Sequence, residues 1–312
     1  MIPNNEPLTR NIAWKILNIG CPWRVSPCCT IIPICAHQGM AFIMDKRPIG
    51  VFDSGLGGLT MVKKLAELLP EEDIIYLGDT GRVPYGSRSR ETIVKYACQD
   101  AAFLAEFDIK TMVVACNTVC SVAVDVLKSA HDIPVFEVVN SPAKAAAAAT
   151  KNKKIGIIGT AATIRSGAYE AAIKKLSPDL DVYSIACPLF VPLVEEGWTD
   201  PDDEAAFDIT KRYLEGLLGA DIDTLVLGCT HYPLLRGVIS KVMGPEVRLI
   251  DSGAETAKLV AADLRDRGML SDNRADGTVR YYVTDSIEGF SKMASRYLES
   301  DVHGMVKQVT LE

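Results

Sequence analysis

Residues 111–118, TMVVACNT, and residues 224–231, TLVLGCTH, decide the fold. Each stretch is a short apolar run that ends in a cysteine, Cys116 or Cys229, and a threonine follows closely. Such runs, bounded by polar residues, are typical of buried strands in a parallel sheet. We therefore expect each cysteine at the carboxyl end of a buried strand, where open α/β sheets bind their ligands.

The rest of the chain follows one plan twice. From residue 48 onward, strand-like runs alternate with helical patterns, which predicts parallel sheets covered by helices on both faces. PIGVFDSG corresponds to KIGIIGTAAT at an offset of 106 residues, and the two cysteines lie 113 residues apart. These similar offsets indicate an α/β fold of two similar domains, related by an approximate twofold axis, with the active site between them.

The end of the chain predicts an unequal division. A helical stretch, AETAKLVAADLRDRG, leads to the strand-like TVRYYVTDS and to a last helix around residues 287–298. These elements complete the first domain in our interpretation, so the domains are residues 44–140 plus 252–312 and residues 141–251. Further helices are expected over residues 60–69, 90–106 and 122–130.

The first 43 residues show no sustained helical or strand period, and we interpret them as an extension outside the core. Their short apolar run is a poor match to a secretory signal. Met44 is a plausible alternative start. A zinc cluster is the competing interpretation, although the spacing fits no CxxC pair. Its ligands would be Cys21, Cys28, Cys29, Cys35 and His37.

Composition narrows the class of protein. The chain has 312 residues, and its 33 basic and 40 acidic side chains give a net charge of −7, which argues against a general nucleic-acid binder. Because no run of 18 uncharged apolar residues occurs, we expect no membrane-spanning helix. Nine cysteines are too few for a disulfide scaffold, and reduced thiols in the cytoplasm are expected.

Two thiols at equivalent strand ends suit a reaction on both faces of one carbon. Inversion of an amino acid removes a proton from one face of Cα and returns one to the other. A thiol with a pKa of about 8.5 is about 3 % thiolate at pH 7, and helix N-termini after Cys116 and Cys229 would favour the thiolate. Asp53 and His231 are candidates for moving protons to and from sulfur. The alternatives are small buried side chains or a disulfide.

The polar residues at the other strand ends suit a small zwitterion. DSGLGGLT lacks the GxGxxG spacing of a dinucleotide loop, and Asp53 would repel a phosphate. The four histidines are scattered, so we expect no metal site. Glu195 either reaches the cleft and acts on His231 or is solvated like Glu196. The candidate ligand-binding groups are Ser54, Tyr85, Gly86, Asn117, Thr118, Thr160, Thr163, Thr230 and His231.

Six ordered motifs resemble bacterial glutamate racemase, a member of the aspartate/glutamate racemase family. They are IGVFDSGLGGLT, YLGDTGRVPYG, VVACNT, GIIGTAAT, CPLFVPLVEEG and LGCTHYPLL, and the resemblance covers about residues 48–300. It implies cofactor-independent interconversion of L- and D-glutamate, which supplies D-glutamate for peptidoglycan in the cytoplasm, by an enzyme that is often a homodimer.

The resemblance also implies roles for single residues. Cys116 is similar to the base that acts on the D-enantiomer and Cys229 to the base that acts on the L-enantiomer. Asp53, Glu195 and His231 match residues that assist proton transfer. The substrate contacts implied are the pairs Asp53–Ser54, Tyr85–Gly86, Asn117–Thr118 and Thr230–His231.

Other functions stay open at this point. A racemase of aspartate or another amino acid would share the same plan. A decarboxylase of the superfamily would be expected to keep one catalytic thiol, and this chain has two. A binding protein that inhibits a DNA topoisomerase is a candidate from a different class.

Overall fold

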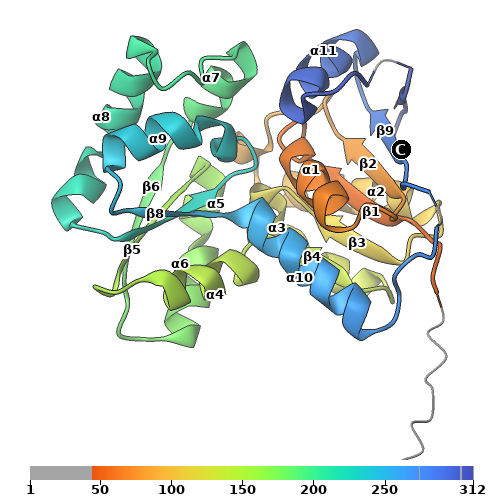
Figure 1. The fold of residues 1–312 in the computed structure, drawn as a ribbon, viewed down its shortest axis with the longest axis horizontal. Helices are drawn as coiled ribbons and strands as arrows, with labels where there is room; N and C mark the ends of the chain where they lie inside the picture. The colour runs from red at the N-terminus through yellow and green to blue at the C-terminus, as the bar shows by residue number, and fades with distance from the viewer. Residues whose placement is uncertain (1–43, 274, 303, 312) are drawn as a thin grey trace, which may run out of the picture. The chain divides into compact units, whose positions relative to one another are not determined.

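In the computed structural model, which describes residues 44–273, 275–302 and 304–311, all strand pairs are parallel and form two sheets (Figure 1). The first sheet consists, in spatial order, of β10 (Val306–Gln308), β9 (Val279–Val283), β2 (Ile74–Gly78), β1 (Ile49–Asp53), β3 (Thr111–Val114) and β4 (Val135–Glu137). The second consists of β6 (Asp181–Ala186), β5 (Lys154–Gly159), β7 (Thr224–Gly228) and β8 (Arg248–Asp251).

The two sheets share one strand order, which supports the duplication inferred from the sequence. The order β2-β1-β3-β4 in the first sheet matches β6-β5-β7-β8 in the second. The predicted α/β fold with two parallel sheets flanked by helices is confirmed. Residues 44–140 and 252–312 contain the strands of the first sheet, and residues 141–251 contain those of the second. The domain boundaries themselves stay a prediction.

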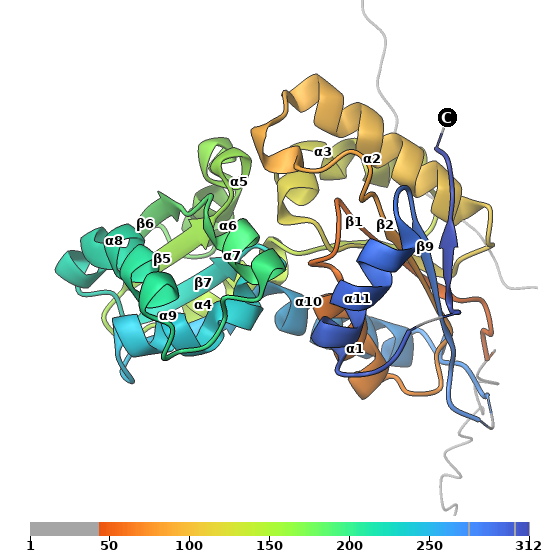
Figure 2. The ribbon, with the colours of Figure 1, turned by 90° about the horizontal axis from the view of Figure 1, so that it is seen from above.

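Helices cover both faces of each sheet, because their apolar residues recur at the helical period. In the first sheet, α2 and α3 lie on one side of β1 and β2, and α1 and α11 lie on the other (Figure 2). The helices that follow first-sheet strands are α1 (Leu59–Leu68), α2 (Arg90–Ala105), α3 (Asn117–Ala130), α4 (Asn140–Ala149) and α11 (Ile287–Leu298). The others are α5 (Ala161–Ser166), α6 (Ala168–Leu176), α7 (Phe190–Glu196), α8 (Glu204–Ala220), α9 (Arg236–Met243) and α10 (Ser252–Asp266). Two 3₁₀ turns, η1 (Tyr85–Ser87) and η2 (Tyr232–Leu235), complete the set.

The structure differs from the sequence expectations at both cysteines. Helix α3 begins at Asn117, not near residue 122, so Cys116 is its N-cap residue. After Cys229 no α-helix begins directly, because the η2 turn precedes α9. The last helix lies at residues 287–298 as predicted, whereas the three-residue strand β10 was not predicted.

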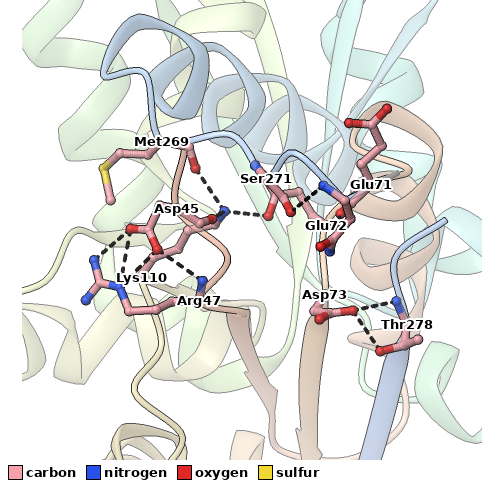
Figure 3. A network of polar contacts seen from close by, with 10 residues as sticks. Asp45, Arg47, Glu71, Glu72, Asp73, Lys110, Met269, Ser271 and Thr278 are labelled. Atoms are coloured by element: carbon pink, nitrogen blue, oxygen red, sulfur yellow. Dashed lines mark hydrogen bonds and ion pairs between the residues drawn. The ribbon is translucent and has the colours of Figure 1, made fainter. Parts of the chain in front are cut away.

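A buried lysine ties together the amino-terminal edge of the first sheet (Figure 3). Lys110, which precedes β3, donates hydrogen bonds to the backbone oxygens of Asp45 at 2.7 Å and Met269 at 2.9 Å. Its Nζ also lies 2.5 Å from Glu72 Oε2, and Glu72 Oε1 accepts a hydrogen bond from Ser271 N. The segments before β1, β2 and β3 are thereby joined to the connection between α10 and β9.

Two sequence expectations concern membranes and the extension. No helix in the described part of the chain is long and apolar enough to cross a membrane. Residues 1–43, including the cysteines and the histidine considered as zinc ligands, lie outside the described residues.

Candidate active site

A cavity of about 340 Å³ lies where β1, β3, β5 and β7 end. Its position follows from the parallel topology, because the carboxyl ends of parallel strands meet at one edge of a sheet. The residues that line it are Ser54, Gly55, Val83, Pro84, Tyr85, Gly86, Ser87, Cys116, Asn117, Thr118, Thr160, Ala161, Pro188, Val191, Pro192, Glu195, Cys229, Thr230 and His231. The cavity therefore joins elements of both sheets.

Both predicted thiols line this cavity. Cys116 and Cys229 are buried, and both are free cysteines, so no disulfide joins them. The Cys116 thiol donates a hydrogen bond of 3.2 Å to Ser54 Oγ. Two reduced thiols at equivalent strand ends can both act on one ligand held in the same cavity.

The surroundings of Cys116 favour the neutral form of its thiol. Burial, and to a smaller extent the Asp53 carboxylate, raises the pKa of the Cys116 thiol to about 12. The sequence had suggested that a helix N-terminus would favour the thiolate, and α3 does begin at the next residue. Removal from water and the neighbouring carboxylate outweigh the helix, since both disfavour an anion there.

Asp53 lies behind the cavity wall and does not line the cavity. Its side chain is fully buried at the end of β1, and Oδ2 accepts a hydrogen bond of 3.0 Å from Gly55 N. Oδ1 is buried without a hydrogen-bond partner. Burial raises the pKa of Asp53, although the nearby His231 opposes this shift. A carboxyl group in such a place can hold a proton close to Cys116.

His231 links Cys229 to Glu195. Its Nδ1 lies 3.9 Å from Cys229 Sγ, and its Nε2 lies 3.2 Å from Glu195 Oε1. Burial alone would lower the pKa of His231, but hydrogen bonds to Cys229 and Glu195 raise it to about 10. Glu195, which the sequence left between a cleft position and a solvated one, lines the cavity. The protonated imidazole is a proton donor beside the Cys229 sulfur.

Three threonine hydroxyls form a chain between α3 and α5. Thr118 Oγ1 lies 3.0 Å from Thr160 Oγ1, which lies 3.0 Å from Thr163 Oγ1. Thr118 and Thr160 line the cavity, whereas Thr163 stands one step behind Thr160. Hydroxyls can donate to a carboxylate, so this chain suits an acidic ligand.

The turn over residues 83–87 forms another wall. Tyr85 lines the cavity, but its hydroxyl points away and hydrogen bonds to Asp79 and, at 3.2 Å, to Asp100. A β-carbon on Gly86 would lie 3.0 Å from Thr160 Cβ, so the backbone passes close to the threonine chain. This wall therefore presents its backbone groups to a ligand, while the Tyr85 hydroxyl is occupied by Asp79 and Asp100.

Eight lining residues are not among those singled out from the sequence: Gly55, Val83, Pro84, Ser87, Ala161, Pro188, Val191 and Pro192. Pro188, Val191 and Pro192 form an apolar wall near the start of α7. Together with Glu195 they are spaced by three, four and seven residues, the spacing of one helical face. That spacing in CPLFVPLVEEG was the available signal.

No metal centre is evident in residues 44–273, 275–302 and 304–311. In these ranges no group of three or more histidine, cysteine, aspartate or glutamate side chains is placed to hold a metal ion.

Comparison with known proteins gives one consistent result. A profile of the Asp/Glu/hydantoin racemase family matches residues 49–260. A glutamate racemase of Geobacter metallireducens is 49% identical over 269 residues, which are 86% of this chain and 98% of that protein. A glutamate racemase isoform from Bacillus anthracis has a crystal structure that superimposes with a TM-score of 0.81, at 41% identity, over 85% of this chain and 97% of that one. The Francisella tularensis glutamate racemase, solved with D-glutamate, has a TM-score of 0.80 at 38% identity, over 86% and 99% of the two chains.

Proposed function

Because the chain belongs to the Asp/Glu/hydantoin racemase family, we propose that it interconverts L- and D-glutamate without a cofactor. The observation that carries this proposal is the pair of free thiols, Cys116 and Cys229, on one cavity at equivalent strand ends. The relatives and structures that resemble the chain over most of its length are glutamate racemases, which supports glutamate as the substrate.

The reaction is a proton exchange at Cα. For D-glutamate, the Cys116 thiolate takes the α-proton, and the electron pair stays on the substrate carbon. The Cys229 thiol then gives its proton to the opposite face, which yields L-glutamate and leaves a Cys229 thiolate. The reverse reaction uses the same steps with the two sulfurs exchanged. No other bond is made or broken.

Neighbouring groups reset the protons on sulfur. Asp53, which is close enough to raise the pKa of Cys116, is the proposed relay on that side. His231, held 3.2 Å from Glu195 and 3.9 Å from the Cys229 sulfur, is the proposed relay on the other. The pairing matches one carboxyl group to one thiol and one imidazole to the other, so each sulfur has its own proton source.

The cavity suits a small acidic amino acid. Its volume of about 340 Å³ lies at the small end of the range of roughly 300–1,000 Å³ for ligand sites. Ser54, Thr118, Thr160 and Thr230 can donate hydrogen bonds to the substrate carboxylates. We propose Tyr85, Gly86 and Asn117 as further substrate contacts, with Thr163 supporting Thr160. The D-glutamate formed would supply peptidoglycan synthesis in the cytoplasm, and the enzyme would act as a homodimer.

Circular dichroism tests the proposal directly. The purified protein is incubated with L-glutamate in buffer that contains a metal chelator and no pyridoxal phosphate, and the ellipticity of the substrate should decay to zero. D-glutamate should give the mirror-image decay. If the ellipticity decays with L-aspartate and not with L-glutamate, the substrate is aspartate and the proposal of glutamate is wrong. Activity that disappears with the chelator and returns only with metal would show that the reaction is not cofactor-independent.

A further inference from the structure

We propose that Tyr169 is a positioning residue that sets the separation between the two thiols. Tyr169 lies on α6, belongs to none of the six motifs, and does not line the cavity. It nevertheless contacts the chain directly beside each cysteine, through its hydroxyl on one side and through the adjacent edge of its ring on the other. The inference rests on the proposed function, because it concerns the placement of the two bases.

The hydroxyl of Tyr169 contacts the Cys116 side. It lies 2.5 Å from Asn117 Oδ1 and 2.6 Å from Val138 O, and the tyrosine is almost completely buried. Asn117 follows Cys116 in sequence and is the first residue of α3. A contact at Asn117 therefore acts on the residue next to the first thiol.

The ring of Tyr169 packs on the Cys229 side. A β-carbon on Gly228 would lie 3.2 Å from Tyr169 Cε2 and 2.7 Å from Ile158 O. The ring therefore occupies space that any side chain at residue 228 would need. Because Gly228 directly precedes Cys229, the same tyrosine supports the backbone of the second thiol.

Further contacts make the Cys116 end a junction of several segments. The other end of the Asn117 amide donates a hydrogen bond of 3.3 Å to Ser252 Oγ, at the first residue of α10. Val138 N donates to Cys120 Sγ at 3.5 Å, so both backbone groups of Val138 are engaged with this cluster. Val138 and Ser252 lie where the chain passes between elements of the first and second sheets. Tyr169 thus joins α3 to both connections.

The Tyr169 hydroxyl lies at the centre of this junction, where the Ser252 side chain is a further hydrogen-bond partner. It carries one proton and faces two carbonyl oxygens, and both of these lie in the interior. Removing it leaves buried polar groups without a partner, which the structure can relieve only by shifting Asn117 or Val138. A Tyr169→Phe chain keeps the ring against Gly228 and loses the contact to Asn117. The Cys116 side is then released while the Cys229 side is retained.

Elimination from a substrate analogue reads out the two sides separately. Racemisation cannot do so, because its equilibrium constant of one forces equal kcat/KM in both directions. A glutamate with a leaving group on Cβ needs one base only: the thiolate takes the α-proton, and the electron pair expels the leaving group. Under the proposed roles, the D-form reports on Cys116 and the L-form reports on Cys229.

The matched control removes another hydrogen bond from a hydroxyl to a backbone oxygen nearby. Ser141 Oγ donates a bond of 2.9 Å to Glu255 O, which joins α4 to α10 without touching Asn117. Tyr169→Phe should lower elimination from the D-form about tenfold more than from the L-form, since misplacement of a reacting group by about 1 Å can cost up to roughly 10²-fold. Ser141→Ala should leave the ratio of the two rates at the wild-type value. Equal loss from both forms in Tyr169→Phe would overturn the proposal.

Two further measurements keep the test decisive. If Tyr169→Phe does not fold, Ser252→Ala removes the other partner of Asn117 and should shift the ratio in the same direction. Alkylation by iodoacetamide, followed by mass spectrometry, compares Cys116 with Cys229 without any turnover. If the wild type does not racemise glutamate but Tyr169→Phe changes the alkylation ratio of the two cysteines, the proposed function is rejected and the positioning role of Tyr169 is retained. An unchanged ratio in both assays rejects the positioning role alone.

Discussion

Gly57 lies so close to Thr230 that a β-carbon on the glycine would stand 2.1 Å from the threonine Oγ1. The same added atom would lie 2.5 Å from His231 Nδ1. The loop after β1 thus closes directly on the segment after β7. Thr60 reinforces the approach, because its hydroxyl contacts Thr230 O at 3.1 Å.

Gly57→Ala should therefore lower activity strongly. The methyl group must displace Thr230 or His231, both of which line the cavity, and a fall in kcat/KM of roughly 10–100-fold is expected. Gly219→Ala is the control, because a β-carbon there meets no atom within 4 Å and alanine favours the helix. Circular dichroism of glutamate measures both variants. If Gly57→Ala is as active as the control, the loop after β1 accommodates the methyl group without displacing Thr230 or His231.

Cys116→Ser and Cys229→Ser should each abolish racemisation. Each turnover needs a base on one face and an acid on the other, and a serine hydroxyl is too weak an acid to give an alkoxide at neutral pH. With a Cβ leaving group, Cys116→Ser should eliminate from the L-form only and Cys229→Ser from the D-form only. Release of the leaving group provides the assay. Equal processing of both enantiomers by either variant would contradict the one-sided roles.

The buried pair of Lys110 and Glu72 should matter to stability and not to chemistry. Lys110→Met leaves the Glu72 carboxylate buried without a counter-charge and frees two backbone oxygens, so the free energy of unfolding should fall by about 3–5 kcal/mol. Lys110→Met combined with Glu72→Gln removes the stranded charge and keeps an acceptor for Ser271 N, so part of the loss should return. Urea unfolding measures both. If Lys110→Met alone is as stable as the wild type, water must reach the Glu72 carboxylate in the variant.

The contact between Glu195 and His231 should give a pH-dependent contribution to stability. A histidine whose folded pKa is raised to about 10 stabilises the fold fully below its unfolded value of about 6.5. This contribution is lost as the pH rises through the folded pKa. The difference in unfolding free energy between the wild type and Glu195→Gln should be largest between about pH 5 and 6.5, where carboxylates are ionised, and should close towards pH 10.

The neighbouring glutamate is the control for this pH effect. Glu196 is exposed and makes no hydrogen bond or ion pair to His231, so Glu196→Gln should show no such pH dependence. NMR titration of the imidazole should also show a lower pKa in Glu195→Gln. If the difference in unfolding free energy between the wild type and Glu195→Gln does not change between pH 6 and 10, the protonated imidazole does not contribute to stability through Glu195.

The sequence predicted the parts of the site that sit on regular strands. Cys116 and Cys229 could be placed because apolar strands have a readable pattern and because the pattern occurs twice. The start of α3 was missed, since Asn117 and Thr118 have low helix propensity and the N-cap Cys116 makes no side-chain cap bond. The burial of Asp53 behind the wall was not readable either, because one polar residue at a strand end can point to either side.

Contacts between distant segments set the limit of prediction. Tyr169 contacts Asn117 across 52 residues of sequence, and nothing local to α6 marks a tyrosine that contacts the start of a remote helix. The apolar wall at Val191 and Pro192 had a helical spacing, but only the packed structure shows which side of α7 faces the cavity. The contacts of such residues are determined only when the elements of the two sheets pack together.

The strand order has a consequence for the newly made chain. In the first sheet, β2 pairs with β1 on one side and with β9 on the other. Strand β9 is formed by residues 279–283, so the ribosome delivers it after the whole second sheet has emerged. Throughout that interval β2, whose five residues are all apolar or glycine except for Tyr76, presents an open edge that could pair with another chain. Slow translation of the residues between β2 and β9 would therefore lengthen the time during which this edge is open to another chain.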